Sequence, residues 1–227
     1  MMQRTEVVSR VRLTYAVDSP LSYVSVLDMG RLWERMLRRA DLPLAYTQGY
    51  HPHPRIYFAA PLPVGYSSEC ELLDVMLAQP IPPIDLLRAL LRQAPQGLTV
   101  VSAEGVPVKT SSPQSTMETA HYVVDIESPA SREGVRDALA ALLGRETIIL
   151  KRYRRGRMVD YDMRRLIRDL THVSERAGCH RVEMVLKCGS QGSGRPERIV
   201  AELNIPTGNV SIHRTRLIWG GAKENAS

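Results

Sequence analysis

The hydrophobic pattern of this 227-residue chain changes from a period of two residues to a period near 3.6, and it does so in the same order in each half. Residues 8–16 alternate apolar and polar side chains, which predicts a half-buried strand. Residues 26–40 then carry apolar side chains at helical spacing opposite a face of arginines, which predicts an amphipathic helix. A chain that makes this change of period twice is restricted to folds built from two mixed α and β units.

The expected elements follow the order β-α-β-β-α-β in both halves. In the first half we expect strands at residues 8–16, 56–60, 70–77 and 98–103 and helices at 26–40 and 82–91. In the second half we expect strands at 121–126, 147–150, 181–187 and 210–218 and helices at 131–143 and 193–203. This order is that of the ferredoxin-like unit, an antiparallel sheet with two helices on one face. We therefore predict an α+β protein with two ferredoxin-like halves in tandem.

Two segments interrupt this plan. Residues 107–117 are rich in Ser, Pro, Thr and Lys without periodicity, so we interpret them as a linker between a first half at 1–106 and a second half at 118–227. Residues 151–178 are interpreted as an insertion in the second half, formed by a hairpin and a short helix near 163–170. The halves share element order but no clear residue-level repeat.

Charge and cysteine content restrict the class of partner and the compartment. The net charge is +6 and the pI is about 9.4, which favours polyanionic partners such as RNA, DNA or an acidic protein surface. Cys70, Cys179 and Cys188 form no CxxC pair, so neither a disulfide framework nor a cysteine-only metal site is expected. The sequence has no run of 18 apolar residues and no apolar N-terminal segment. We expect a cytoplasmic protein without membrane contact.

The first candidate site is the segment at residues 46–55, which presents two histidines and an arginine on a strip that also contains two prolines. Prolines hold the backbone extended, so Gln48, His51, His53 and Arg55 are candidates to bind an anion or a nucleobase. The alternative is a stiff loop whose histidines are polar surface. Two histidines at this spacing suit a metal ion only with a further ligand, and none is evident, so no metal site is predicted.

The second candidate is a strongly basic segment that is expected to form the tip of a hairpin. Arginine side chains bind phosphates through paired N–H donors, and a tyrosine among them can stack on a base. The alternative is a solvated basic turn that pairs with the nearby Asp160, Asp162 and Asp169. The residues predicted to bind RNA or another anion are Lys151, Arg152, Tyr153, Arg154, Arg155 and Arg157.

The third candidate is a glycine-rich loop before the last expected helix. Backbone amides at a helix start can hold an anion, so Gly192, Ser193, Gly194 and Arg195 are candidates, with Ser193 as a possible cap. The spacing matches neither a P-loop nor a dinucleotide-binding fingerprint. A flexible connection explains the loop equally well.

Catalytic candidates are weak. Asp28 and Arg31 have the spacing of an intrahelical ion pair, which explains them without a reaction. The sequence contains no GxSxG or HExxH motif. Asp28, His51 and His53 are the residues that we would test first for catalysis.

One long segment resembles a known family. "LDMGRLWERMLRRADLPLAYTQGYHPHPRIYFAAPLPVGYSSECELLDVML", and later "RGRMVDYDMRRLIRDL", "GSGRPERIVAEL" and "HRTRLIW", resemble the radical-SAM-linked or radical-SAM-associated proteins, a domain of unknown function. The resemblance covers nearly the whole chain and is most specific over residues 27–65. Val26 and His51 depart from the pattern, because many members have a histidine and an asparagine there.

The resemblance implies a partner rather than a reaction. Such proteins are typically encoded beside a radical SAM protein, or fused to one, among neighbours concerned with ribosomes and RNA processing. This chain has no CxxxCxxC motif, so the iron–sulfur cluster and S-adenosylmethionine are implied for the partner and no cofactor is expected here.

Three functions remain open at this point. The first is a non-catalytic module that binds tRNA, rRNA or an RNA-linked substrate for the radical SAM protein. The second is an RNA-modifying or RNA-cleaving enzyme, because tandem ferredoxin-like halves also occur in tRNA pseudouridine synthases and CRISPR repeat-processing endonucleases. The third is a subunit that docks on the radical SAM protein without touching RNA.

Overall fold

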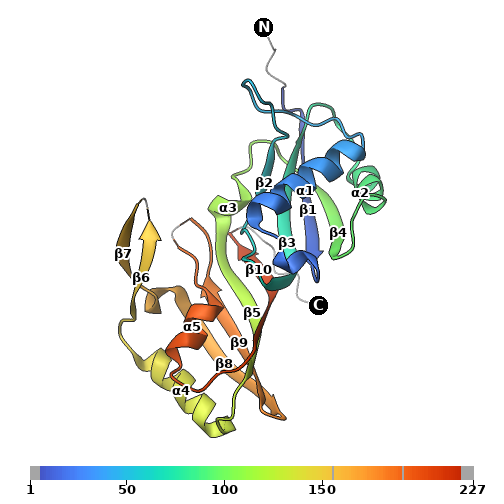
Figure 1. Ribbon diagram of the computed structural model, residues 1–227. Helices are drawn as coiled ribbons and strands as arrows, with labels where there is room; N and C mark the ends of the chain where they lie inside the picture. Colours follow the sequence, from blue (N-terminus) through green and yellow to red (C-terminus); the bar gives the residue numbers. More distant parts are fainter. Residues whose placement is uncertain (1–5, 155, 191, 221–227) are drawn as a thin grey trace. The chain divides into compact units, whose positions relative to one another are not determined.

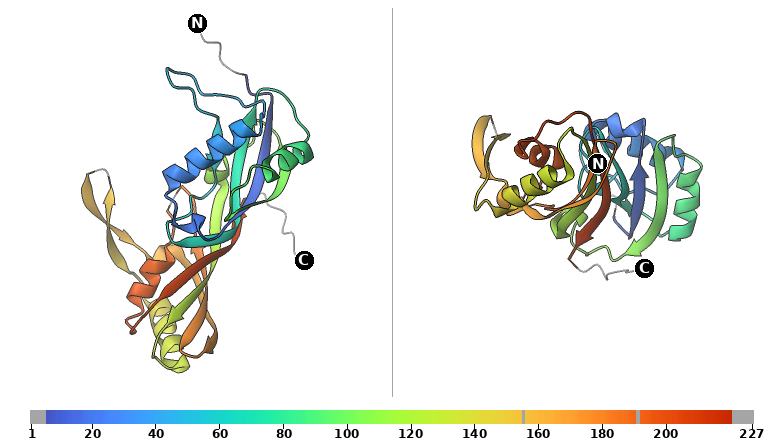
Figure 2. Two further views of the ribbon diagram at one scale, coloured as in Figure 1. Left: turned by 45° about the vertical axis from the view of Figure 1, so that its right-hand side comes forward. Right: turned by 90° about the horizontal axis from the view of Figure 1, so that it is seen from below.

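The computed structural model describes residues 6–154, 156–190 and 192–220. They form two compact units, and the described parts of Met1–Met117 and Trp219–Ser227 make up unit 1. Unit 2 comprises the described part of Glu118–Ile218. The elements of both units are shown in Figure 1, with further views in Figure 2.

Unit 1 has the ferredoxin-like order of strands. Its elements are β1 (Ser9–Val17), the 3-10 turn η1 (Leu21–Tyr23), α1 (Val26–Arg39), β2 (Ile56–Phe58), β3 (Tyr66–Leu77), α2 (Pro83–Leu91), β4 (Leu98–Val106) and α3 (Pro113–Thr116). The strands pair antiparallel in the order β4-β1-β3-β2. Leu13, for example, lies opposite Leu73 on one side and Ala103 on the other. The predicted β-α-β-β-α-β order of the first half is confirmed.

The core of unit 1 lies between one face of this sheet and the two helices. Trp33, Met36 and Leu37 of α1 are fully buried at helical spacing. The ring of Tyr15 in β1 packs edge-on against Trp33, with 4.9 Å between ring centroids. This packing fixes α1 with its arginines away from the sheet, as the sequence predicts.

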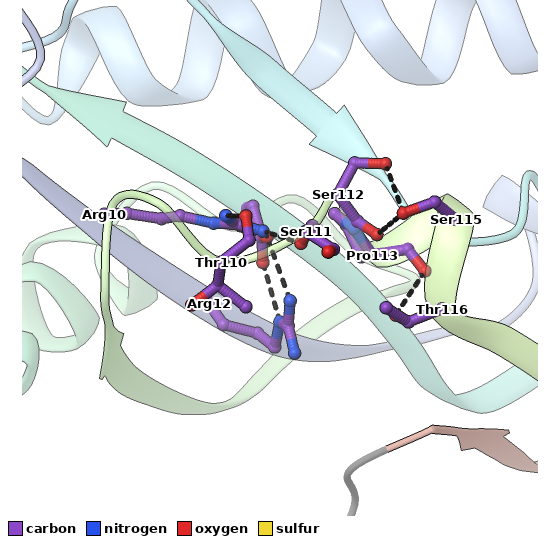
Figure 3. Close-up of polar contacts among 9 residues, drawn as sticks. Arg10, Arg12, Thr110, Ser111, Ser112, Pro113, Ser115 and Thr116 are labelled. Carbon is purple, nitrogen blue, oxygen red and sulfur yellow. Dashed lines mark hydrogen bonds and ion pairs between the residues drawn. The ribbon is translucent and has the colours of Figure 1, made fainter.

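The other face of the unit 1 sheet buries charge, which the sequence does not predict. Arg10 and Arg12 are 3% and 6% exposed, so β1 is buried on both faces rather than half-buried. Both guanidinium groups bind the carboxylate of Asp74, which has no exposed surface; Arg12 Nε lies 2.8 Å from Asp74 Oδ1. Figure 3 shows the two arginines on β1 with the segment at residues 110–116 beside them.

Residues 107–117, predicted as a linker, make hydrogen bonds to the unit 1 sheet. Arg10 donates hydrogen bonds to the carbonyl oxygens of Thr110 and Ser111, the second at 2.9 Å. The segment therefore crosses the charged face of the unit 1 sheet and covers the buried arginines (Figure 3). These bonds link its path to the side chains of β1.

Unit 2 repeats the strand order and adds a hairpin. Its elements are β5 (Met117–Glu127), α4 (Arg132–Gly144), β6 (Ile149–Arg154), β7 (Arg157–Asp162), the 3-10 turn η2 (Arg164–Leu166), β8 (Ile167–Arg176), β9 (Cys179–Lys187), α5 (Pro196–Glu202) and β10 (Val210–Trp219). The strand order is β10-β5-β9-β8, and β6 and β7 form a separate two-stranded sheet. The tandem ferredoxin-like fold and its inserted hairpin are confirmed.

The insertion differs in detail from the prediction. The strand expected at 147–150 as part of the main sheet is instead the start of the hairpin, and β8 takes its place in that sheet. The helix expected near 163–170 is only the three-residue η2. Met163, Leu166, Ile167 and Leu170 have helical spacing, and register shifts in β8 break the alternation that would identify a strand.

The helices α4 and α5 begin differently. Ser131 caps α4 by accepting a hydrogen bond from the N–H of Gly134, as predicted. Ser193 does not cap α5, because the N-cap is Arg195 and the Ser193 hydroxyl accepts from the N–H of Gly189. Within the described part of the chain, no helix has the length and apolar character needed to cross a membrane.

Candidate nucleic-acid interface

The β6–β7 hairpin sorts the basic residues onto two faces. Directly opposed residues of an antiparallel pair project to the same side, and successive residues alternate. One side, here called the arginine face, carries the pairs Leu150–Tyr161, Arg152–Val159 and Arg154–Arg157. The other, here called the Tyr153 face, carries Ile149–Asp162, Lys151–Asp160 and Tyr153–Met158. The predicted cluster is therefore divided, with Lys151 and Tyr153 turned away from the arginines.

The arginine face carries three positively charged side chains, those of Arg152, Arg154 and Arg157. Arg154 lies directly opposite Arg157, so like charges face each other across the strands. The guanidinium carbon of Arg152 lies 4.9 Å from the ring centroid of Tyr161, within the range of a cation–π contact. Among the residues that the structure describes, no acidic side chain forms an ion pair with Arg152, Arg154 or Arg157. Arg155 was also predicted to bind, and it lies outside the described residues.

The aspartates that might neutralise this cluster are mostly engaged elsewhere. Asp162 accepts hydrogen bonds from the backbone N–H groups of Ile148 and Arg164, at 2.9 and 3.0 Å. The bond from Ile148, more than any other contact, lowers the pKa of the Asp162 carboxyl. Asp169 accepts a hydrogen bond from the hydroxyl of Thr171. Only Asp160 opposes a cation of the cluster, Lys151, on the Tyr153 face.

The same contacts hold the base of the hairpin. The N–H of Met163 donates to the carbonyl of Ile148 at 2.8 Å, and the Met163 side chain is buried in unit 2. Arg165 Nε lies 3.1 Å from the Asp162 carboxylate. The base is thus fixed while the exposed strands extend from the body of unit 2 (Figure 2). This arrangement presents the arginine face to a ligand in a defined orientation.

The histidine-containing segment forms a second, smaller turn between α1 and β2. Tyr46 bridges to Pro54, and the N–H of Thr47 donates to the carbonyl of His53 at 2.9 Å. The tip residues Gln48 and His51 are exposed, and the ring of Tyr50 next to them is 98% exposed. The turn, closed by these backbone contacts, presents polar and aromatic side chains to solvent.

The remaining predicted residues of this segment lie at its base. His53 Nδ1 lies 3.5 Å from the Glu34 carboxylate of α1, and Arg55 is half-buried with its N–H bonded to the carbonyl of Ala45. No group of three potential ligands among His, Cys, Asp and Glu gathers in the described ranges. The contacts of the segment are those of an exposed surface loop.

Asp28 occupies the first turn of α1 as a capping residue. Its N–H donates to Ser25 Oγ, whose hydroxyl donates back to the carboxylate at 2.7 Å. Arg31 binds the same carboxylate at 3.0 Å. The Ser25 hydrogen bond first, and then Arg31, hold the pKa of the Asp28 carboxyl below its ordinary value. Asp28 shares no hydrogen bond or ion pair with His51 or His53 in the described structure, so the three do not form a common catalytic group.

A family match covers most of the chain. The family model described as "Uncharacterized protein conserved in bacteria (DUF2344)" matches residues 10–196. The chain belongs to this family. The matched range of the DUF2344 protein includes both the histidine-containing loop and the β6–β7 hairpin. No curated protein matches the chain.

Solved structures give three further comparisons for the DUF2344 protein. A Cbf5–Nop10–Gar1 complex is 10% identical over 94% of this chain and 50% of that chain, with a TM-score of 0.49. An H/ACA RNP bound to a substrate RNA containing 2′-deoxyuridine is 9% identical over 89% and 47%, with a TM-score of 0.44. An unknown protein from Galdieria sulphuraria is 14% identical over 92% and 99%, with a TM-score of 0.27. The chain spans about half the length of the first two, and none of these similarities bears on its ligands.

Two glycines of the glycine-rich loop of the DUF2344 protein pack closely against neighbouring side chains. A Cβ atom at Gly194 would lie 2.9 Å from the Cβ of Leu186, and one at Gly192 would lie 3.1 Å from Cδ2 of Leu166. The loop therefore packs against η2, directly after the hairpin. Arg195 lies 3.6 Å from the Glu197 carboxylate. Anion binding at Gly192–Arg195 stays a prediction, and α5 contributes only seven residues beyond it.

Sequence reasoning missed one member of the interface. Tyr161, rather than Tyr153, shares the arginine face. Alternate residues of a strand project to the same side, so a hairpin with its turn at Gly156 places Arg152, Arg154 and Arg157 on the same side as Tyr161. The alternation along the strands therefore contains this information, but it can be read only when the pairing of β6 with β7 is known.

Proposed function

We propose that this DUF2344 protein is an RNA-binding accessory module whose arginine face contacts phosphates. In this proposal the protein acts with a radical SAM protein in the modification of tRNA or rRNA. The iron–sulfur cluster and S-adenosylmethionine belong to that partner. The observation that carries the proposal is the opposed pair Arg154–Arg157 beside Arg152 and Tyr161, with no ion-paired acid among the described residues.

Electrostatics support a polyanionic ligand. Two cations directly opposed across strands destabilise the pair, by about 0.2–1 kcal/mol relative to neutral residues. A phosphate placed between Arg154 and Arg157 removes this repulsion and accepts paired N–H bonds from each guanidinium. The hairpin is therefore suited to be occupied by an anion rather than to remain bare.

The aromatic group on this face favours nucleic acid over a simple anion. The Arg152 guanidinium lies over the ring of Tyr161 in a cation–π contact, on the same face as the other two arginines. Proteins that bind single-stranded nucleic acid combine arginines that follow the backbone with flat groups on which bases stack. The histidine-containing loop of unit 1 adds exposed polar and aromatic groups on a separate element.

Binding of the full chain to RNA tests the first part of the proposal. The measurement is fluorescence anisotropy with a labelled tRNA transcript and a labelled single-stranded RNA across a salt series. The test variant is Arg152→Ala/Arg154→Ala/Arg157→Ala. The control is Arg88→Ala/Arg92→Ala/Lys109→Ala, three exposed cations of unit 1, so that both variants lose the same charge.

We expect the hairpin variant to reduce the slope of log affinity against log salt by about 2, since each lost contact to single-stranded RNA removes about 0.7. The control variant should keep the wild-type slope. Equal losses in both variants would show that binding depends on total charge rather than on the arginine face. Absence of RNA binding by the wild-type chain would contradict the proposal altogether.

Co-purification tests the partner. A tagged chain isolated from its own organism after nuclease treatment should retain a protein with a CxxxCxxC motif and bound iron. If the two separate once RNA is digested, the association is mediated by RNA. If no such protein is recovered with or without nuclease, the partner part of the proposal is wrong.

A further inference from the structure

A row of arginines on α1 lines a groove of unit 1 that none of the sites above includes. Arg31, Arg35 and Arg39 follow one another at intervals of four residues, on the exposed side of α1 opposite the buried Trp33. With a rise of 1.5 Å per residue, successive side chains start about 6 Å apart along the helix. The groove, here called the α1 groove, is lined by Val24, Asp28, Arg31, Leu32, Arg35, Arg39 and Pro95.

The charges of the α1 groove are only partly compensated. Arg31 pairs with Asp28, the one acidic residue of the lining. Arg39 donates to the backbone carbonyl of Gln93 at 3.5 Å, which leaves its charge in place. Arg35 has no ion-pair partner among the residues that the structure describes. Three cations and one carboxylate leave the groove positively charged.

Apolar side chains form the rest of the lining. Val24, Leu32 and Pro95 are half-buried between the arginines. Next to Val24 and Asp28 in the chain, Tyr23 and Leu27 are 73% and 77% exposed, unusually high values for large apolar side chains. A cationic rim, an apolar lining and an exposed aromatic neighbour are the features of surfaces that bind single-stranded nucleic acid.

We infer that the α1 groove is a second RNA-contact surface, which binds the backbone of a single-stranded segment. This inference rests on the proposed function. The arginines contact successive phosphates, and the apolar lining contacts sugars and the faces of bases, which are free to stack only where the RNA is unpaired. Arginine suits this task because its planar group grips a phosphate through two N–H donors.

The test compares two exposed double variants within unit 1. Arg35→Ala/Arg39→Ala alters the α1 groove, and Arg88→Ala/Arg92→Ala removes the same charge from α2. The probe is a labelled oligouridine of twelve residues, measured with the full chain in a salt series. We expect the groove variant to bind roughly tenfold more weakly and to lose about 1.4 from the salt slope, while the α2 variant changes little.

Comparison with the hairpin variant separates this inference from the proposed function. If the groove variant behaves like the α2 control while Arg152→Ala/Arg154→Ala/Arg157→Ala loses binding, the groove inference is wrong and the proposed function stands. If only the groove variant loses binding, the inference stands and the hairpin is not the RNA site. Tighter binding of a polyglutamate peptide than of oligouridine at the groove would identify an acidic protein as the ligand and overturn the inference.

Discussion

Arg154 and Arg157 lie directly opposite each other across the β6–β7 hairpin, and their side chains share one face with Arg152 and Tyr161. A cluster that appears continuous in the sequence is thus divided by the strand register. Its three described arginines point to one side, and Lys151 and Tyr153 point to the other. This division makes predictions that a diffuse basic patch would not.

Reversing one charge of the opposed pair should stabilise the hairpin and weaken RNA binding at the same time. Arg157→Glu replaces a like-charge pair with an opposite-charge pair, so we expect the free energy of unfolding to rise by about 0.2–1 kcal/mol. RNA affinity should fall because a carboxylate now stands where a phosphate would bind. Chemical denaturation and anisotropy measure the two effects.

Lys151→Glu is the matched control, because it makes the same charge change on the Tyr153 face. There it places a glutamate opposite Asp160, so stability should fall slightly. RNA affinity should change much less than in Arg157→Glu. Equal effects of the two substitutions on affinity would contradict the assignment of the ligand to one face.

The buried carboxylate of Asp74 should be far more important for stability than an exposed one. Asp74→Asn leaves the guanidinium groups of Arg10 and Arg12 buried without a counter-charge, and we expect a loss of about 3–5 kcal/mol. Asp85→Asn, which removes an exposed partner of Arg88, should change stability by about 0.5 kcal/mol or less. Urea denaturation measures both, and a comparable loss in the two would contradict the buried triad.

The glycine-rich loop should tolerate no side chain at Gly194. A methyl group there meets Leu186 at 2.9 Å, so Gly194→Ala should destabilise the protein by about 1–3 kcal/mol. Gly30→Ala is the control, because nothing lies within 4 Å of its Cβ position in α1. That change should stabilise by about 0.5–1 kcal/mol. Thermal unfolding distinguishes the two, and a neutral Gly194→Ala would mean that the loop is open.

The order of strands and helices in both units could be predicted because the spacing of apolar residues differs between a strand and a helix. The six strands and helices expected in the first half are present, with ends that differ from the prediction by up to four residues, and Ser131 was correctly placed as a cap. β8 was missed because its register shifts remove the alternation, and its first residues have helical spacing. The burial of Arg10 was missed because its partner Asp74 is 64 residues away, and sequence spacing carries no information on such pairs.

The candidate interface was predicted in composition but not in geometry. The sequence identifies a basic hairpin, yet only the pairing of β6 with β7 shows which cations act together. The arginines of α1 were assigned to the solvent face of a helix, which is correct. Pro95 reaches that face from beyond α2 and completes the groove, and such a tertiary contact has no signature in local sequence.

A pair formed by the buried His180 and the half-buried His172 should make stability depend on pH. His172 Nε2 lies 3.2 Å from His180 Nδ1, and His180 Nε2 lies 3.1 Å from the carbonyl of Ala130. A carbonyl only accepts, so neutral His180 donates to it and His172 donates to His180. Burial first, then His180 and the arginines of α4, lower the pKa of His172.

Because the pKa of His172 is lowered in the folded state, the unfolded chain binds more protons as the pH falls through the ordinary histidine pKa of about 6.5. The stabilisation is complete above that pH and is lost as the pH falls toward the lowered pKa. His172→Gln should make the free energy of unfolding depend less on pH between about 7.5 and 5.5, the range in which histidine changes its charge. The glutamine amide can still donate a hydrogen bond to His180. His51→Gln in the exposed loop is the control, and identical profiles for both variants would remove the pair as the cause.

Photo-crosslinking of the two hairpin tyrosines tests the central claim most directly. Tyr161→p-benzoylphenylalanine places the reactive group on the arginine face, and Tyr153→p-benzoylphenylalanine places it on the other face of the same hairpin. Irradiation of each variant with a labelled tRNA transcript, followed by denaturing electrophoresis, reports contact. RNA binding by the arginine face predicts a crosslink from position 161 and little or none from position 153. A stronger crosslink from position 153, or equal crosslinks from both, would contradict it.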